Sequence, residues 1–366
     1  MITSSNLAIR PNLHAGRFGY LGWIGHANLG DDAIHEVLRA TLPRSEFLDV
    51  PAYPRQLVRV ARNGGLSGLR TARLLLGGGT VIGRTNWRAH VVVGMRLCRG
   101  GTPLLIGAGV EDPSFHGRRS FSSFGELKRW KPVLERFDRI TVRGPRSATL
   151  LADVGIEAMV VGDPALLFAP LPGQAREHGR VGVALGYGDA LRGGDQSAVV
   201  SAVADALRHL HSAGHSVTMF VVNPTDRRHA EHCLAEAGLV EDGRTVRMVE
   251  AADPSTFCMQ VSTCDAIIAQ RLHAGILATA CATLPVMLAY QPKVDDFMAS
   301  IGELQWSTPT DRLRGAAIAE QVALRIGGGA AHRHALRERV DVLRAAQAAV
   351  IGAIGFTRPP LRAVTS

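Results

Sequence analysis

The chain has 366 residues, of which 46% are hydrophobic and 20% charged, as expected for a globular protein with large buried sheets. Its formal net charge of +9 favours acidic partners, such as phosphorylated substrates or anionic headgroups, or reflects a solvated arginine-rich surface. Because only 5% of the residues are aromatic and no long basic run occurs, nucleic-acid binding is not expected.

The N-terminal half repeats one pattern: a short apolar strand, a glycine-rich turn and a helix. The first unit has a predicted strand at 18–24, a turn at 25–30 and a helix at 31–41. Further strands are predicted at 73–76, 103–106, 140–142 and 159–161, with another ending at Asp49 and a short helix at 147–154. Short apolar strands that alternate with helices indicate a parallel sheet covered on both faces.

A polar segment with two prolines, 170–179, is the predicted linker, and the pattern then restarts. Strands are predicted at 181–185, 216–222, 266–269 and 286–289, and helices at 196–213, 228–237 and 330–351. The expected fold class is therefore α/β, with two Rossmann-like, doubly wound domains facing across a cleft. We assign 1–172 to the N-terminal domain, 173–353 to the C-terminal domain and 354–366 to a flexible tail.

Cysteine usage and hydropathy predict the compartment. The five cysteines are odd in number and lack the paired spacing of zinc sites, which indicates free thiols packed as small hydrophobes in a reducing cytoplasm. The first 16 residues have no apolar core typical of a secretory signal. The longest uncharged run, 274–291, predicts a buried helix followed by a strand and not a membrane span. We expect a cytoplasmic protein, with any contact to the inner membrane face being peripheral.

Arg271 and His273 form the most informative site motif, because they lie between a predicted strand and the start of a helix. Such a helix N-terminus attracts anions through its unpaired N–H groups and its dipole. A guanidinium and an imidazole at that point predict a receptor for a phosphorylated or carboxylated small molecule, with a proton donor attached.

Other candidates also lie at predicted strand ends, where ligands bind in open parallel sheets. Arg143 is either an anion ligand or part of an interdomain salt bridge, and Lys293 is either a ligand or a surface residue. Asp31 either takes part in substrate binding or only caps its helix. The remaining candidates lie in glycine-containing turns, which bring backbone close to a ligand or merely allow a sharp bend: Asn28, Gly30, Gly78 and Gly79.

Several common cofactor motifs are absent. The glycines of the first turn, Gly22, Gly25 and Gly30, do not have the GxGxxG spacing of a nicotinamide site. No GxxxxGK[ST] sequence occurs, so a P-loop is excluded. The histidine pairs at 209/211 and 229/232 lack companion ligands, and we therefore expect neither a metal nor a cofactor.

An ordered set of phrases resembles the polysaccharide pyruvyl transferase family from about residue 19 to 302. The phrases are Gly25-His26-Ala27-Asn28-Leu29-Gly30-Asp31-Asp32-Ala33-Ile34, Leu76-Gly77-Gly78-Gly79, Thr141-Val142-Arg143-Gly144-Pro145-Arg146-Ser147, Val161-Gly162-Asp163-Pro164-Ala165, and Arg271-Leu272-His273-Ala274 with Tyr290-Gln291-Pro292-Lys293-Val294. Two positions depart from the family pattern: Gly144-Pro145 stands where an acidic residue commonly follows the arginine, and Asp32 stands where glutamate is usual.

The resemblance implies a glycosyltransferase-B-like fold and an activity. Such enzymes transfer the enolpyruvyl carbons of phosphoenolpyruvate, a co-substrate, onto two hydroxyls of a hexose and release phosphate. The family pattern maps the phosphoenolpyruvate-binding arginine and the catalytic histidine onto Arg271 and His273, and a second anion-binding arginine onto Arg143. The implied acceptor is a hexose-containing glycan or a lipid-linked oligosaccharide, expected on the N-terminal domain, with phosphoenolpyruvate on the C-terminal domain.

The chemistry suggests roles for individual side chains. His273 is the expected proton donor, to the enol methylene or to the departing phosphate, and Asp31 is the candidate base for the sugar hydroxyl. Two alternatives stay open. One is a nucleotide-sugar glycosyltransferase of the same architecture, and the other is a basic sugar- or nucleic-acid-binding module without catalysis.

Overall fold

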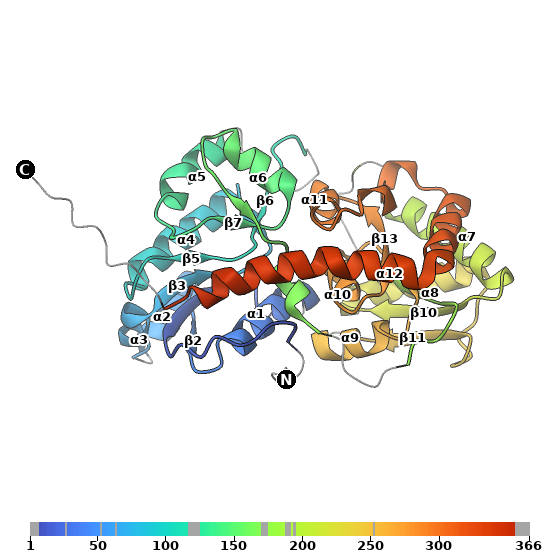
Figure 1. The fold of residues 1–366 in the computed structure, drawn as a ribbon, viewed down its shortest axis with the longest axis horizontal. Helices are drawn as coiled ribbons and strands as arrows, with labels where there is room; N and C mark the ends of the chain where they lie inside the picture. The colour runs from blue at the N-terminus through green and yellow to red at the C-terminus, as the bar shows by residue number, and fades with distance from the viewer. Residues whose placement is uncertain are drawn as a thin grey trace, which may run out of the picture.

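Two sheets of parallel strands, one in each half of the chain, organise the protein (Figure 1). The computed structural model describes residues 7–25, 28–51, 53–62, 64–115, 125–169, 175–186, 192, 195–251 and 253–355. Elements of the N-terminal half are β1 Arg17–Leu21, α1 Leu29–Thr41, β2 Glu46–Asp49, α2 Pro54–Arg62, α3 Leu66–Thr71, β3 Arg73–Leu76, β4 Thr80–Ile82, α4 Thr85–Leu97, β5 Leu104–Leu105, β6 Gly109–Val110, α5 Glu126–Leu134, β7 Thr141–Val142, α6 Pro145–Ala152, β8 Met159–Val160 and η2 Pro164–Leu167.

The C-terminal half follows the same alternation. Its elements are β9 Arg180–Ala184, α7 Gln196–Ser212, β10 Ser216–Val221, η3 Pro224–Asp226, α8 Arg227–Ala237, β11 Val246–Glu250, α9 Pro254–Val261, β12 Ala266–Ala269, α10 Leu272–Ala280, β13 Leu284–Ala289, α11 Pro292–Ser300, η4 Leu304–Trp306, β14 Ser307–Pro309, η5 Thr310–Arg312 and α12 Gly315–Gly352.

Each of the two sheets has a point at which the order of its strands reverses. The N-terminal sheet runs β2-β1-β3-β5, and the C-terminal sheet runs β11-β10-β9-β12-β13-β14, all parallel. In each sheet the order reverses beside the first strand, between β1 and β3 and between β9 and β12. Open α/β sheets bind ligands at such reversals, beyond the carboxyl ends of the strands. The segments that follow β1, β3 and β12 hold most of the candidate residues predicted from the sequence, while Arg143 follows β7 and Lys293 lies after β13.

A continuous apolar core crosses from one half to the other. It contains residues of β1 and α1 from the N-terminal half, of η2, and of β9, β12 and α10 from the C-terminal half. This shared core forms because α1 buries a stripe of apolar residues and because the short β12, Ala-Ile-Ile-Ala, is buried along its whole length. The two Rossmann-like domains are therefore packed directly on each other beneath the turns.

Helix α12 also joins the halves (Figure 1). Its backbone kinks at Gly329, where φ is 44°, and the part beyond this kink contacts the N-terminal half. There Gln347 Nε2 donates to the carbonyl of Val161 at 2.8 Å, and Arg344 Nε donates to the carbonyl of Leu166 at 2.8 Å. The domain limits predicted from the sequence stay a prediction. Residues 170–174 of the predicted linker and most of the predicted tail lie outside the described residues.

Most predicted strands occur within one or two residues of their expected bounds, and the differences have physical causes. The strand β11 was not predicted, because Val-Arg-Met-Val-Glu is a half-exposed edge strand without an apolar run. Helix α12 begins 15 residues before the predicted start at 330, since glycines interrupt its pattern around the kink. All five cysteines are free and buried, and no helix in the described part of the chain is long and apolar enough to cross a membrane.

Candidate active site

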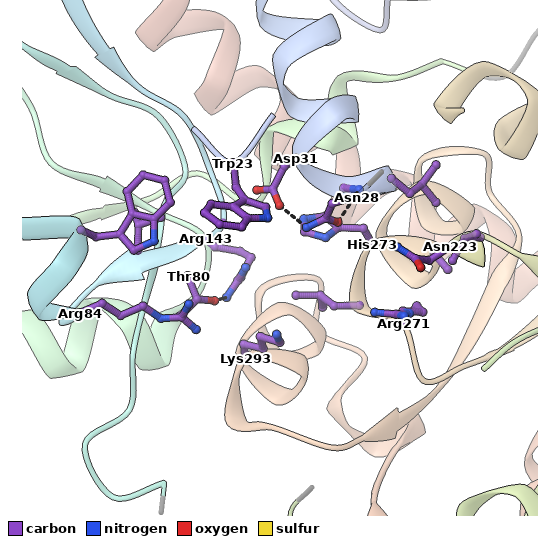
Figure 2. A pocket seen from close by; sticks show the side chains of 18 of the residues that line it. Trp23, Asn28, Asp31, Thr80, Arg84, Arg143, Asn223, Arg271, His273 and Lys293 are labelled. Atoms are coloured by element: carbon purple, nitrogen blue, oxygen red, sulfur yellow. Dashed lines mark hydrogen bonds between the residues drawn. The ribbon is translucent and has the colours of Figure 1, made fainter. Parts of the chain in front are cut away.

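A cavity of about 550 Å³ is lined by residues of both halves (Figure 2). The N-terminal half contributes Trp23, Asn28, Leu29, Gly30, Asp31, Tyr53, Gly79, Thr80, Val81, Arg84, Asn86, Trp87 and Arg143. The C-terminal half contributes Val222, Asn223, Arg271, Leu272, His273, Ala274, Tyr290 and Lys293. The cavity thus lies at the carboxyl ends of both sheets, where the strand orders reverse.

The structure brings together all but one of the predicted site residues. The cavity lining includes Asn28, Gly30, Asp31, Gly79, Arg143, Arg271, His273 and Lys293. Gly78 is not part of this lining, and its place at a substrate stays a prediction. A Cβ atom at this position would lie 2.5 Å from Cδ1 of Ile34, so the absent side chain leaves room for α1.

Four helices begin at the cavity. Asp31, Asn86, His273 and Lys293 lie in the first turns of α1, α4, α10 and α11, each of nine residues or more. Only α1 has a side-chain cap, in which the amide of Gly30 donates to Asn28 Oδ1 at 3.3 Å; the N-cap residues of the other three make none. Converging helix N-termini make the cavity favourable for anions.

His273 and Arg143 share one buried carboxylate. Oδ2 of Asp163 lies 3.7 Å from His273 Nε2 and 3.8 Å from Arg143 Nη1, while its Oδ1 accepts a hydrogen bond from the amide of Ala165 at 3.0 Å. Burial alone would raise the pKa of Asp163, but His273 and Arg143 outweigh it and lower that pKa below its usual value. Asp163 therefore stays ionised and ties a histidine of one half to an arginine of the other.

Arg143 is fully buried, contrary to what a purely solvated arginine would show. Its Nη2 donates to Thr80 Oγ1 at 3.1 Å, whereas Nε and Nη1 have no hydrogen-bond partner among the described residues. Arg143 lines the cavity, and its one ion pair among the described residues, with Asp163, lies within the N-terminal half. The structure therefore does not show the interdomain salt bridge that was the alternative.

Arg271 is held by a two-pronged contact with Asp226, which comes from η3. Nε donates to Asp226 Oδ2 at 3.0 Å and Nη2 donates to Oδ1, while Nη1 has no hydrogen bond to any described residue. Asp226 is buried and about a third of the Arg271 side chain is exposed. A carboxylate behind the guanidinium fixes its plane and leaves one edge for a ligand.

Asp31 has the electrostatics of a base that works near neutral pH. Burial raises its pKa from 3.8 to about 6, with nearby Asp163 adding to the rise, while His273 and Lys293 oppose it. Asn28 Nδ2 donates a hydrogen bond to its Oδ2 (Figure 2). Lys293 in turn places its Nζ 4.8 Å from the centre of the Tyr290 ring, so its ammonium is held over an aromatic face.

Three glycines make room for three of the predicted site side chains. A Cβ at Gly30 would lie 1.9 Å from His273 Nδ1, one at Gly109 would lie 2.4 Å from Arg143 Nη2, and one at Gly186 would lie 2.5 Å from Arg271 Nε. Each distance is far below van der Waals contact. Any other residue at these positions would displace the neighbouring cation or imidazole.

The loop after Arg143 is held by a carboxylate from the opposite half. Asp296, on α11, accepts hydrogen bonds from the amides of Arg146 (2.9 Å) and Ser147 (3.2 Å) and from Ser147 Oγ (2.6 Å). It therefore caps the N-terminus of α6. A Cβ at Gly144 would lie 2.2 Å from Asp296 atoms, so the glycine permits this approach. The carboxylate at this helix end therefore comes from Asp296 of α11 and not from the residue after Arg143, which is Gly144.

Other functional candidates were missed at the level of sequence. The carboxylates Asp163, Asp226 and Asp296 follow or begin elements, but only the fold shows which cation or helix each one meets. Three of the four tryptophan and tyrosine residues of the lining, Trp23, Tyr53 and Trp87, come from the N-terminal half, and the fourth, Tyr290, comes from the C-terminal half. Trp23 and Tyr53 are 38% and 41% exposed, which is high for such large rings and marks an accessible apolar wall. No group of three or more metal-ligating side chains occurs among the described residues.

Comparison with known proteins gives a family and a fold. A sequence model of the family "Polysaccharide pyruvyl transferase" matches residues 28–292, which is most of the chain. No curated protein matches the sequence at a significant level.

Among solved structures, a protein described as a UDP-N-acetylglucosamine 2-epimerase from Listeria monocytogenes aligns over 94% of this chain and 98% of its own, with 12% identity and a TM-score of 0.56. A glycosyltransferase from Rickettsia africae aligns over 94% and 97%, with 8% identity and a TM-score of 0.51. At such identities the likeness shows the fold alone, which is glycosyltransferase-B-like.

Proposed function

The chain belongs to the polysaccharide pyruvyl transferase family, and we propose that it transfers the enolpyruvyl carbons of phosphoenolpyruvate onto two hydroxyls of a hexose. The products are a cyclic pyruvate ketal and phosphate. The observation that carries this proposal is the convergence of Arg143, Arg271 and Lys293 with the imidazole of His273 on one cavity, beside a carboxylate whose pKa is about 6.

The donor suits the cationic part of the cavity. Phosphoenolpyruvate carries a phosphate and a carboxylate, and such a molecule needs several positive groups with well-defined geometry. Arg271 and Lys293 supply them from the C-terminal half, together with the N-termini of α10 and α11. Arg143 supplies a third from the opposite side. No metal or cofactor enters the proposal, because these groups can stabilise the charge of the donor.

The proton transfers balance with two side chains. His273 donates a proton to the methylene carbon, which becomes the methyl group, and one sugar hydroxyl adds to the central carbon. Asp31 accepts the proton of that hydroxyl. It later passes a proton to His273, which is thereby reprotonated. The second hydroxyl then forms its bond to the same carbon as the C–O bond to phosphate breaks, and its proton leaves with phosphate. The pKa of Asp31, raised by burial to about 6, suits a base that works near neutral pH.

The acceptor is proposed to bind on the N-terminal side. Trp23, Tyr53 and Trp87 present flat apolar surface there, and sugar rings have apolar faces that stack on aromatic side chains while their hydroxyls reach polar neighbours. The acceptor in this proposal is a hexose-containing glycan or a lipid-linked oligosaccharide. The proposed location is the cytoplasm, with peripheral contact to the inner membrane face.

Thermal unfolding with candidate donors separates this proposal from a nucleotide-sugar glycosyltransferase. Phosphoenolpyruvate at 100 times its Kd should raise the free energy of unfolding by about 2.7 kcal/mol, and nucleotide sugars should leave it unchanged. The reverse pattern would favour the glycosyltransferase.

Replacing the proton donor tests the chemistry itself. His273→Ala should slow phosphate release from phosphoenolpyruvate by at least ~100-fold in the presence of a hexose acceptor. His334→Ala is the matched control, because His334 is an exposed histidine on α12 and should leave the rate unchanged. Equal rates in both variants would remove His273 from the mechanism.

A further inference from the structure

The net charge of the protein resides in one stretch of sequence. Residues 50–110 contain nine arginines and no aspartate, glutamate or lysine. The other 305 residues hold 32 basic and 32 acidic side chains, so their formal charge is zero. A charge of +9 confined to one sixth of the chain is not the dispersed arginine decoration of a solvated surface.

Six of the nine arginines make an exposed group that we call the arginine face: Arg55, Arg59, Arg62, Arg70, Arg96 and Arg99. No ion pair joins any of the six to a carboxylate among the described residues. The other three are partly or fully buried and lie within 4 Å of an acidic side chain from outside the stretch, in the pairs Arg73–Asp138, Arg84–Glu111 and Arg88–Glu126. The structure therefore separates arginines with a structural partner from arginines that face solvent.

The arginine face is carried by α2, α3 and the end of α4, which belong to the N-terminal half (Figure 1). The amide of Arg99 donates to the carbonyl of Arg70 at 3.3 Å, which joins the ends of α3 and α4. The Tyr53 and His90 rings, 5.5 Å apart at their centres, join the start of α2 to α4. These contacts hold the three helices as one surface.

Apolar side chains are exposed among these arginines. Val58 on α2 is 48% exposed and Val93 on α4 is 37% exposed. On α2 the exposed Arg55, Arg59 and Arg62 are spaced four and three residues apart and therefore share one side of the helix. Guanidinium groups beside solvent-facing valines are the composition with which amphipathic helices bind the interface of anionic membranes.

We propose that the arginine face docks the protein on an anionic lipid bilayer. Lipid phosphates pair with the six guanidinium groups, and Val58 and Val93 contact the headgroup–acyl boundary. Tyr53 directly precedes α2 and lines the cavity, so docking brings the N-terminal wall of the cavity close to the bilayer. That a lipid-linked acceptor enters from this side rests on the proposed function; the docking itself does not.

Co-sedimentation with vesicles tests the docking without any measurement of catalysis. The full chain should sediment with vesicles containing about a third phosphatidylglycerol at roughly 100 mM salt, remain in solution with pure phosphatidylcholine, and dissociate as salt is raised. The variant R55Q/R59Q/R62Q should bind anionic vesicles roughly 100-fold more weakly, because each of the three arginines near the surface contributes about fivefold to the affinity. The control R312Q/R314Q/R337Q, which removes three exposed arginines of the C-terminal half, should bind like the unaltered protein.

The outcomes are decisive in both directions. No sedimentation of the unaltered protein, or equal weakening in both triple variants, would overturn the proposal. Binding to duplex DNA at the same salt with no vesicle binding would reassign the face to nucleic acid and overturn it as well. Phosphate release with a soluble acceptor should be the same in R55Q/R59Q/R62Q and the unaltered chain. Absence of phosphate release in the unaltered chain would contradict the proposed function and leave the docking intact, whereas absence of vesicle binding would contradict the docking and leave the proposed function intact.

Discussion

Replacing Asp31 by asparagine should stabilise the protein while it removes activity. The carboxylate is partly buried in the first turn of α1, and its pKa is raised from 3.8 to about 6. The folded protein therefore holds a proton that the unfolded chain releases between about pH 4 and 6. The contribution of this raised pKa to the free energy of unfolding is fully present below pH 4 and is lost as the pH rises through about 6. Asparagine is neutral at every pH and does not incur this loss.

The size of the effect follows from the two pKa values. A difference of about two pKa units corresponds to about 3 kcal/mol at 1.36 kcal/mol each. By linkage, the free energy of unfolding of Asp31→Asn should exceed that of the unaltered protein by about 1 kcal/mol at pH 4.5 and by about 3 kcal/mol at pH 8. Asparagine can still accept the hydrogen bond from Asn28, so the packing should persist.

Urea unfolding between about pH 4.5 and 8 measures the difference directly. Asp32→Asn is the control, because Asp32 lies in the same helical turn and its removal should lower stability by about 0.3–1 kcal/mol through the loss of a favourable helix-end charge. For the unaltered enzyme, kcat/KM should rise with pH through about 6, and Asp31→Asn should lose at least ~100-fold in rate. A stability difference that does not change with pH would refute the reasoning, because it would show that the carboxylate is not desolvated.

Two further variants test how the cavity is held. Gly30→Ala should abolish measurable transfer, since its Cβ would lie 1.9 Å from the ring of His273. Gly327→Ala is the control, because a Cβ there has no atom within 4 Å and should leave the rate unchanged. Equal kinetics for the two variants would contradict the packing argument. Asp296→Ala should lower the free energy of unfolding by about 2 kcal/mol and raise KM for phosphoenolpyruvate, because it uncaps α6 from across the domain boundary. Asp195→Ala removes a cap within one domain and should lower stability by about 1 kcal/mol with KM unaltered, so a KM change in this control would argue against a specific effect.

The sequence predicted the architecture and most of the cavity because both depend on local patterns. Short apolar strands followed by glycine turns define Rossmann-like units, and parallel strands bring their carboxyl ends to one edge. For this reason residues as far apart as Asn28 and Lys293 could be expected in one crevice, and the structure lines one cavity with them. A glycine motif does not show whether the absent side chain makes room for a ligand or for a helix, and at Gly78 only the structure shows that a Cβ would meet Ile34 of α1.

Only the tertiary structure decided which charges meet. Nothing in the local sequence pairs Asp226 with Arg271, or places Asp163 between Arg143 and His273, because these partners come from segments 20 to 110 residues apart. The raised pKa of Asp31 likewise depends on its burial in the folded protein. The amino-acid sequence determined the strands, the turns and the positions of the cations. Packing of the two domains determined their orientation and electrostatics, since burial and through-space charge are properties of the assembled fold.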